Sequence, residues 1–328
     1  MHIESINQPG AVDLETSDCK PSRELETCNH LLGQPTALKT FYEENGYLLA
    51  RQVLNPESIA EARDAMLAVA VQRGLARSGD KDALWTGQAS KPAKEEGTDF
   101  SGISSRLFAY PDNLATLEKM LGERACWVPN VSYRLRPPGG FVTPVHQDGF
   151  YSPGIHNFRP VWVPLTPCPR NVGGLMIAVG QNRRGYFHNL AKPAPYAIPV
   201  GMIDPGSWAT SDFLPGDMLV IHPYAPHASM PNTSDRLRVT LDTRVQSSAN
   251  PTALAATVLD VTPDTIRVNA EGAGEVTYRV DRESYIRVTD PGTNDTFERF
   301  AEVTKPGMRL VIVHDGNYAL MLRRAAEG

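Results

Sequence analysis

A histidine and an aspartate two residues apart, His146 and Asp148, are the side chains of this sequence best placed to bind a metal ion. In an extended strand, residues i and i+2 point to the same face, so an imidazole and a carboxylate at this spacing reach one point. A third ligand must come from elsewhere, and His227 is the best candidate. Two histidines and one carboxylate on one face of an octahedral ion leave three positions open, as in iron(II) oxygenases.

An isolated His-x-Asp pair carries little weight, because a lone histidine is more often a surface or capped core residue than a ligand. Arg238 adds to the pattern, since it lies eleven residues after His227 at the start of an expected strand. A guanidinium in a barrel wall near an iron ion is a fitting bidentate anchor for a carboxylate. A surface arginine in a salt bridge is the competing interpretation of Arg238.

Short β runs separated by proline and glycine fill the middle of the chain. The expected strands cover residues 127–136, 160–165, 175–179, 218–222 and 237–245. Strands this short, in succession and without intervening helices, predict an antiparallel barrel or sandwich. In such a fold two distant strands face each other, which a site built from His146, Asp148 and His227 requires.

Two helices are expected before this β series. A short one covers about 36–45, and a strand follows it at 47–50. Asn55 as N-cap and Pro56 as the first helical residue open the second helix. Residues 75–103 are charged and rich in glycine and serine without periodicity, which predicts a long loop of the kind that forms lids.

The chain divides into three predicted parts. Residues 1–35 are polar, with no apolar period, and indicate a flexible leader. Residues 36–248 form the domain that holds the candidate ligands, and residues 250–328 are predicted to form a small β-barrel-like appended domain. Its expected strands are 257–261, 265–269, 276–280, 285–289, 309–315 and 318–323. The appended domain covers the active site, forms a dimer contact or is a separate interaction module, and the sequence leaves these alternatives open.

The bulk composition is that of an ordinary globular protein, with 41% hydrophobic and 21% charged residues. A formal net charge of −5 and the lack of a long Lys/Arg cluster argue against a nucleic-acid partner. The four scattered cysteines indicate reduced thiols. No secretory signal and no apolar run of about 18 residues are visible, so we expect a cytoplasmic protein with no membrane partner.

Several motifs succeed one another in a fixed order along the chain. They are Phe41-Tyr-Glu-Glu-Asn-Gly-Tyr-Leu-Leu, Tyr133-Arg-Leu-Arg-Pro-Pro-Gly-Gly, His146-Gln-Asp, Trp162-Val-Pro-Leu, Asn171-Val-Gly-Gly-Leu, Pro215-Gly-Asp-Met-Leu-Val-Ile-His and His227-Ala-Ser-Met-Pro-Asn with Arg238. Together they resemble the phytanoyl-CoA dioxygenase (PhyH) family of iron(II)- and 2-oxoglutarate-dependent oxygenases. The resemblance covers about residues 36–248, and the ordered set is far more specific than any single motif.

This resemblance implies a mainly β fold with flanking helices, built on a double-stranded β-helix (jelly roll, or cupin-like) core. It implies an enzyme that uses Fe(II), 2-oxoglutarate as cosubstrate, and O2. The metal ligands would be His146, Asp148 and His227. Arg238, with Ser229 assisting, would bind the distal carboxylate of 2-oxoglutarate.

Four further residues are candidates for this site. Gln147 and Trp162 match positions that border the cosubstrate in the family. Tyr151 and His156 lie just beyond the metal-binding segment and are candidate substrate contacts, with loop packing as the competing interpretation. Residues 179–182 depart from the Pro-Gly-Ser-His of many family members at a loop that borders the active site, so no substrate contacts are carried over there.

Asp148 also bears on the reaction. Halogenases related to this family have a small residue in place of the carboxylate, so its presence favours hydroxylation, with desaturation or cyclisation as related outcomes. The expected substrate is a small molecule with an unactivated C–H bond, as in a biosynthetic tailoring step. Formation of a homodimer stays open.

Two alternatives stand beside the oxygenase. One is a zinc hydrolase or isomerase on a cupin scaffold, although hydrolytic zinc sites more often show three histidines or two histidines and a glutamate. The other is a non-catalytic metal-binding protein. His222, five residues before His227, is a rival ligand that we expect to be structural.

Overall fold

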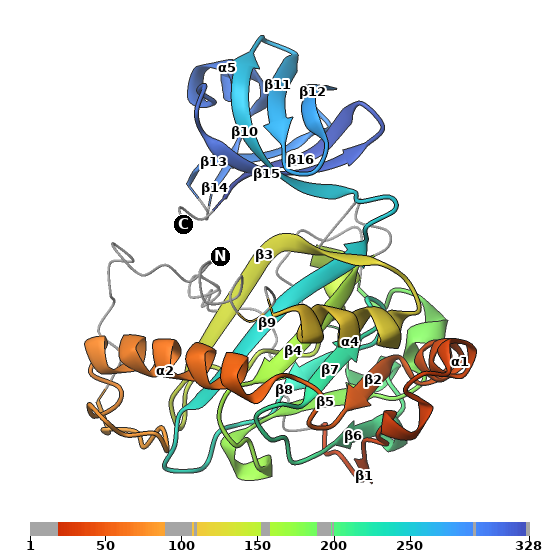
Figure 1. The fold of residues 1–328 in the computed structure, drawn as a ribbon, viewed down its shortest axis with the longest axis vertical. Coiled ribbons are helices and arrows are strands. Elements are labelled where there is room, and N and C mark those ends of the chain that lie inside the picture. Colours follow the sequence, from red (N-terminus) through yellow and green to blue (C-terminus); the bar gives the residue numbers. More distant parts are fainter. Residues whose placement is uncertain are drawn as a thin grey trace.

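The structure is a computed structural model of the 328-residue chain. It describes residues 19–88, 107, 110–151, 158–188, 198, 200–290 and 293–325. These residues form a larger unit of two β-sheets with flanking helices, followed by a smaller β unit at the C-terminal end (Figure 1).

Two mainly antiparallel sheets face each other in the larger unit. The five-stranded sheet has the order β2-β7-β4-β9-β3, and the four-stranded sheet has the order β1-β6-β5-β8. The first contains Tyr47–Ala50 (β2), Ala125–Arg136 (β3), Arg159–Pro164 (β4), Met218–Ile221 (β7) and Arg238–Ser247 (β9). The second contains Arg23–Glu24 (β1), Leu175–Ala178 (β5), Trp208–Thr210 (β6) and His227–Ser229 (β8). Side chains of both sheets meet in one apolar cluster that includes Trp162, Leu219 and Ile177. The predicted jelly roll is confirmed.

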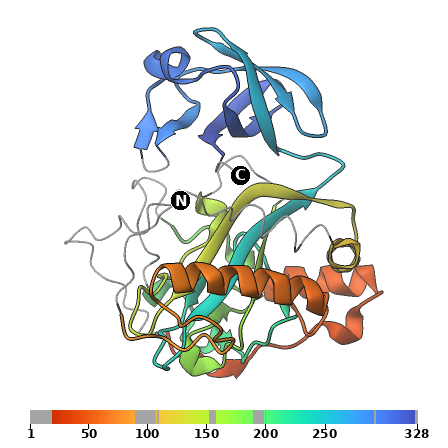
Figure 2. The same cartoon turned by 60° about the vertical axis from the view of Figure 1, so that its left-hand side comes forward.

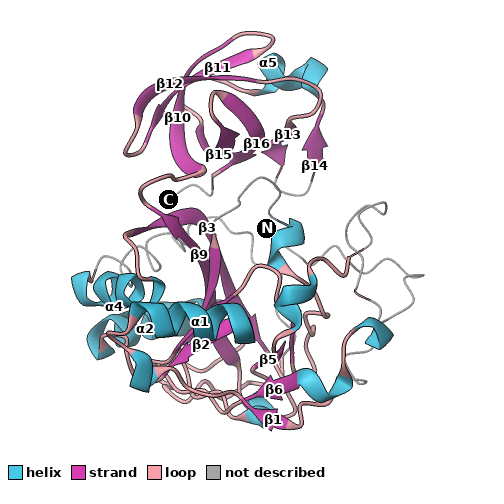
Figure 3. Ribbon diagram, turned by 90° about the vertical axis from the view of Figure 1, so that its right-hand side faces the viewer, coloured by secondary structure: helices cyan, strands magenta, loops and turns pink. Residues whose placement is uncertain are grey.

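Three helices lie against the outer face of the five-stranded sheet (Figures 1 and 3). They are Pro35–Asn45 (α1), Pro56–Gln72 (α2) and Pro111–Leu121 (α4). Helix α2 begins as the sequence predicts, because the Asn55 side chain accepts hydrogen bonds from the backbone N–H groups of Glu57 and Ser58. Its apolar face, which includes Ile59 and Met66, is buried against the sheet in the main core of the larger unit.

The prediction of a flexible leader is wrong for residues 19–34. Strand β1 pairs in parallel with β6, and Cys19, Leu25 and Cys28 are buried. These apolar residues show no helical or strand period. Their burial depends on the pairing of β1 with β6, and the local sequence does not predict this pairing. The rest of the predicted leader, residues 1–18, lies outside the described residues.

The expected loop at 75–103 is described as far as residue 88. In this part Leu75 and Ala83 are buried in the main core, and the backbone N–H of Trp85 donates to the carbonyl of Asp235. The beginning of the loop is therefore anchored to the larger unit. Residues 89–103, for which the sequence predicts a lid, lie outside the described residues.

The C-terminal unit is a seven-stranded sheet with its own apolar core. It contains Ala253–Val261 (β10), Thr265–Ala270 (β11), Gly274–Arg279 (β12), Tyr285–Asp290 (β13), Thr293–Asp295 (β14), Arg309–Asp315 (β15) and Tyr318–Arg324 (β16), with the short helix Phe300–Val303 (α5). A pairing between Arg279 of β12 and Tyr318 of β16 joins strands at distant places in the sheet order, so the sheet curls into a barrel-like form (Figure 2). The six strands expected here from sequence are all present.

No helix among the described residues is long and apolar enough to span a membrane. All four cysteines are free, as the sequence predicts.

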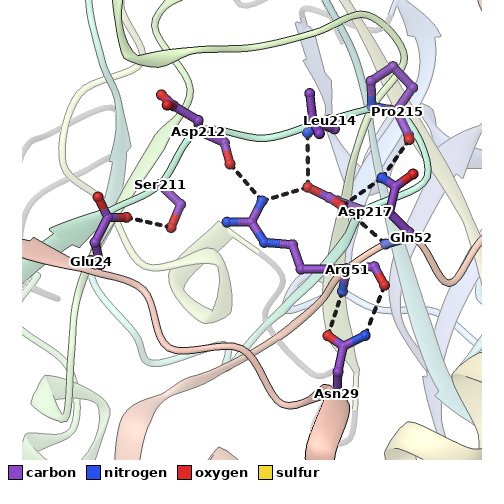
Figure 4. A network of polar contacts seen from close by, with 9 residues as sticks. All are labelled: Glu24, Asn29, Arg51, Gln52, Ser211, Asp212, Leu214, Pro215 and Asp217. Atoms are coloured by element: carbon purple, nitrogen blue, oxygen red, sulfur yellow. Dashed lines mark hydrogen bonds and ion pairs between the residues drawn. The ribbon is translucent and has the colours of Figure 1, made fainter.

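A buried carboxylate holds the turn that leads into β7 (Figure 4). The Asp217 side chain is 1% exposed and accepts hydrogen bonds from the backbone N–H groups of Gln52 and Leu214. The Arg51 guanidinium pairs with the same carboxylate at 2.6 Å and also donates to the carbonyl of Asp212. This network ties the strand before His227 to the segment after β2.

Replacing Asp217 with alanine is expected to lower the free energy of unfolding by about 3 kcal/mol, because it leaves a cation and two backbone donors without their acceptor. Urea denaturation of the purified protein measures this change. Asp235→Ala, at a carboxylate that is 80% exposed, is the matched control and should change stability by less than about 0.5 kcal/mol. Equal stability of the two variants would contradict the role of the network.

Candidate metal centre

The three predicted metal ligands meet in the larger unit. His146, Asp148 and His227 each offer one ligand atom, and these atoms lie within 4.8 Å of one another. The backbones of His146 and His227 are joined by two hydrogen bonds of 2.9–3.0 Å, which sets the two rings side by side at a centroid distance of 4.2 Å. Asp148 begins the short 3-10 helix Asp148–Tyr151, and its Oδ1 atom lies 3.4 Å from Nε2 of His146.

Backbone carbonyls orient both imidazoles. Nδ1 of His146 lies 2.9 Å from the carbonyl oxygen of Pro144, and Nδ1 of His227 lies 3.0 Å from that of Ala225. A carbonyl oxygen only accepts, so each Nδ1 carries the proton and each Nε2 is left with a lone pair. This is the arrangement that metal-binding histidines ordinarily show.

The charges around the site keep the ligands in the forms that bind a metal. Burial opposes ionisation of Asp148, but the Arg244 guanidinium and the two imidazoles outweigh it and hold the pKa of this carboxyl far below its usual range. Burial, and then the neighbouring His146, lowers the pKa of His227 to about 4. At neutral pH the site therefore presents a carboxylate and a neutral imidazole.

The donor set fits iron(II). Two imidazole nitrogens and one carboxylate on the same side of a cavity match the facial arrangement of non-haem iron oxygenases, and the part of the chain that the structure describes adds no thiolate to them. The remaining coordination positions would face the cavity, where a cosubstrate has room to bind.

A buried arginine lies across the same cavity. Arg238 is 3% exposed, and its Nη2 atom donates to the Ser229 hydroxyl at 3.3 Å, while Nη1 donates to the carbonyl of Gly173. The Nε atom of Arg238 is buried without a hydrogen-bond partner among the described residues. A buried guanidinium with an unused N–H is suited to an anion, and a carboxylate satisfies it.

Six of the predicted site residues line one cavity. They are His146, Asp148, Trp162, His227, Ser229 and Arg238. Trp162 reaches it from β4 with its ring packed edge-on against Phe213. The structure thus brings the candidate metal ligands and the candidate 2-oxoglutarate residues together.

Gln147 is not among the residues that line this cavity. Its side chain is fully buried, donates to the carbonyls of Gly185 and Tyr224, and accepts from the backbone N–H of Phe187. Because these hydrogen bonds occupy its amide, Gln147 holds the neighbouring loops and does not border the cavity. For the two predicted substrate contacts, the side chain of Tyr151 and the whole of His156 lie outside the described residues.

His222 does not join the metal ligands. Its Nδ1 accepts from the backbone N–H of Tyr224, its ring packs against Tyr42, and it does not line the cavity. Burial lowers the pKa of His222. These contacts agree with the predicted structural role.

The sequence-based prediction missed a row of polar residues on β9. Arg238, Thr240, Asp242 and Arg244 all line the cavity, and Arg134 of the neighbouring β3 joins them by a 2.8 Å ion pair with Asp242. The signal was present, because polar residues at every second position of a strand occupy one face. Arg238 alone was predicted, since only its position carries the family resemblance.

The chain matches the family model described as phytanoyl-CoA dioxygenase (PhyH) over residues 42–240. It is 30% identical to a 1-deoxypentalenic acid 11-beta-hydroxylase from Streptomyces arenae, covering 68% of this chain and 85% of the relative. A protein of the same name from Streptomyces exfoliatus is 29% identical with the same coverage. Among solved structures, the epimerase SnoN in complex with Fe3+, alpha ketoglutarate and nogalamycin RO aligns with a TM-score of 0.48 at 20% identity, covering 66% of this chain and 85% of that one. The family match spans more than half of the chain, and with the geometry above it shows that the chain belongs to the phytanoyl-CoA dioxygenase family of iron(II)- and 2-oxoglutarate-dependent oxygenases.

Proposed function

We propose that this oxygenase hydroxylates a small molecule at an iron(II) ion held by His146, Asp148 and His227. The observation that carries the proposal is the convergence of these three ligands with a buried, incompletely paired Arg238 in one cavity. Bound iron, with 2-oxoglutarate and dioxygen, supplies the oxidant that attacks an unactivated C–H bond.

Each residue of the cavity has a separate task. Nε2 of each histidine and the carboxylate of Asp148 hold the metal, and the backbone carbonyls fix the ring orientations. Arg238 and Ser229 bind the distal carboxylate of 2-oxoglutarate. The indole of Trp162 forms an apolar wall beside it, which helps to exclude water from the cavity.

The likeness to named hydroxylases supports hydroxylation as the outcome. Both relatives are named for hydroxylation of 1-deoxypentalenic acid. Desaturation and cyclisation differ from hydroxylation only in the step after hydrogen abstraction, so substrate placement decides among them. Membership of the PhyH family favours the oxygenase over the zinc enzyme and over the non-catalytic protein.

Turnover of 2-oxoglutarate tests this proposal. We expect the purified protein to release succinate from 2-oxoglutarate only when Fe(II) and O2 are both present, with zinc unable to replace iron. Mass spectrometry of added candidate substrates should show a gain of one oxygen atom for hydroxylation. Equal succinate release with zinc, or none with iron, would contradict the proposal.

Two further predictions from sequence belong to this proposal. The four free cysteines support a cytoplasmic location, and the negative net charge supports a small-molecule substrate over a nucleic acid. Homodimer formation is left to measurement of the mass in solution.

A further inference from the structure

Three arginines lie near one another where the C-terminal unit packs against the larger unit. Arg287 of β13 and Arg323 of β16 are register partners on adjacent parallel strands. Arg244 of β9 lines the cavity, and its Nη2 atom lies 3.5 Å from Oδ2 of Asp148. Figure 1 shows β13 and β16 on the side of the C-terminal unit that is turned toward β3 and β9.

An apolar cluster fixes the two units together beside these arginines. Val128 of β3 is the register partner of Arg244. Val128 also belongs to a cluster with Val313 of β15 and the partly buried Met321 of β16, two residues before Arg323. This packing brings the strand that carries Arg323 next to the strand pair that carries Arg244.

The three positive charges lie close enough to repel one another. Burial lowers the pKa of Arg323, and the charges of Arg287 and then Arg244 lower it further. Arg287 is 8% exposed, and its Nε atom has no hydrogen-bond partner among the described residues. The Nε atom of Arg244 is also buried without a hydrogen-bond partner among the described residues. Like charges held together out of water are unfavourable, and an anion bound between them removes the repulsion.

We propose that Arg244, Arg287 and Arg323 bind an anionic group, a carboxylate or a phosphate, of the small molecule that this enzyme oxidises. The proposal rests on the proposed function, since a ligand held by Arg244 lies beside Asp148 and extends into the metal cavity. The C-terminal unit supplies two of the three arginines and therefore acts in substrate selection. All three lie beyond residue 240, where the match to the family model ends.

Calorimetric titration of the full-length protein tests this proposal with three probes of similar shape: benzoate, phenyl phosphate and benzamide. The protein is loaded anaerobically with Fe(II) and 2-oxoglutarate, so that Arg238 is already occupied. We expect at least one of the two anions to bind about tenfold or more tightly than benzamide. Arg287→Gln and Arg323→Gln should each weaken the anion about tenfold or more and leave benzamide unchanged, because a charge-assisted hydrogen bond is lost.

Arg267→Gln is the matched control, at an arginine of the same unit that is 47% exposed and pairs with Glu275. It should leave the affinity for the anion unchanged. Three results would each overturn the proposal. They are a native protein that binds neither anion, a native protein that binds anion and amide equally, and an anion affinity that is unchanged by Arg287→Gln and Arg323→Gln. Binding of 2-oxoglutarate is measured in the same samples. If 2-oxoglutarate does not bind, the result counts against the proposed function and not against the arginine site.

Discussion

Replacing His227 with alanine is expected to abolish stoichiometric binding of iron(II) and to lower succinate release by more than about 100-fold. Loss of a group that merely supports a metal ligand costs 10–100-fold in metal affinity or activity, so loss of a ligand costs more. His227 is one of only three protein ligands that the site offers among the described residues, and its Nε2 atom is the one not used by the backbone. Metal content after reconstitution and desalting, together with a succinate assay, measures both effects.

His222→Ala is the sharpest control, because His222 lies five residues earlier and has the same chemistry but does not line the cavity. This variant should keep one iron ion per chain. Circular dichroism should show that both variants are folded. If His222→Ala lost iron while His227→Ala kept it, the assignment of the third ligand would be wrong.

Replacing Arg238 with glutamine is expected to raise the KM for 2-oxoglutarate by about 100-fold or more while iron binding is kept. A guanidinium that donates two charge-assisted hydrogen bonds to a buried carboxylate contributes about 3 kcal/mol or more, which corresponds to this factor. Arg238 is buried, contacts Ser229, and has an Nε atom free to donate. Steady-state succinate release as a function of 2-oxoglutarate concentration measures the change.

Arg236→Gln provides the matched control two residues earlier, since the Arg236 side chain is 42% exposed and pairs with surface carboxylates. Its KM should stay within about twofold of the native value, because exposed ion pairs contribute little. Arg238→Lys adds a second test, as it keeps the charge but loses the planar fork and should give an intermediate KM. A KM unchanged in Arg238→Gln would place the cosubstrate carboxylate elsewhere.

The candidate metal ligands could be predicted from sequence, because their residue types and their order along the chain carry the family resemblance. His146, Asp148 and His227 do converge, although Asp148 begins a 3-10 helix and does not continue the extended strand that the i, i+2 spacing assumes. Gln147 differs from the prediction, because its buried amide bonds to the backbone carbonyls of Gly185 and Tyr224 and does not line the cavity. The family resemblance matches the position of Gln147 along the chain but does not predict where its side chain points.

The strand period places Arg244 on the cavity face of β9, but its partners could not be predicted, because they depend on how distant strands pack. It meets Asp148 because β9 lines the cavity, and it lies near Arg323 because the C-terminal unit packs on β3. The burial of Leu25 and Cys28 in the expected leader has the same origin. Turns and strand periods predicted the strands of the C-terminal unit, but not which face of the larger unit they meet.

A crystal structure of the protein grown with Mn(II) in place of iron and with 2-oxoglutarate would locate both the metal ion and the cosubstrate. We predict one anomalous peak within bonding distance of Nε2 of His146, Nε2 of His227 and a carboxylate oxygen of Asp148. The distal carboxylate of 2-oxoglutarate should contact Arg238 and Ser229. A metal ion bound elsewhere, or 2-oxoglutarate bound away from Arg238, would contradict the account.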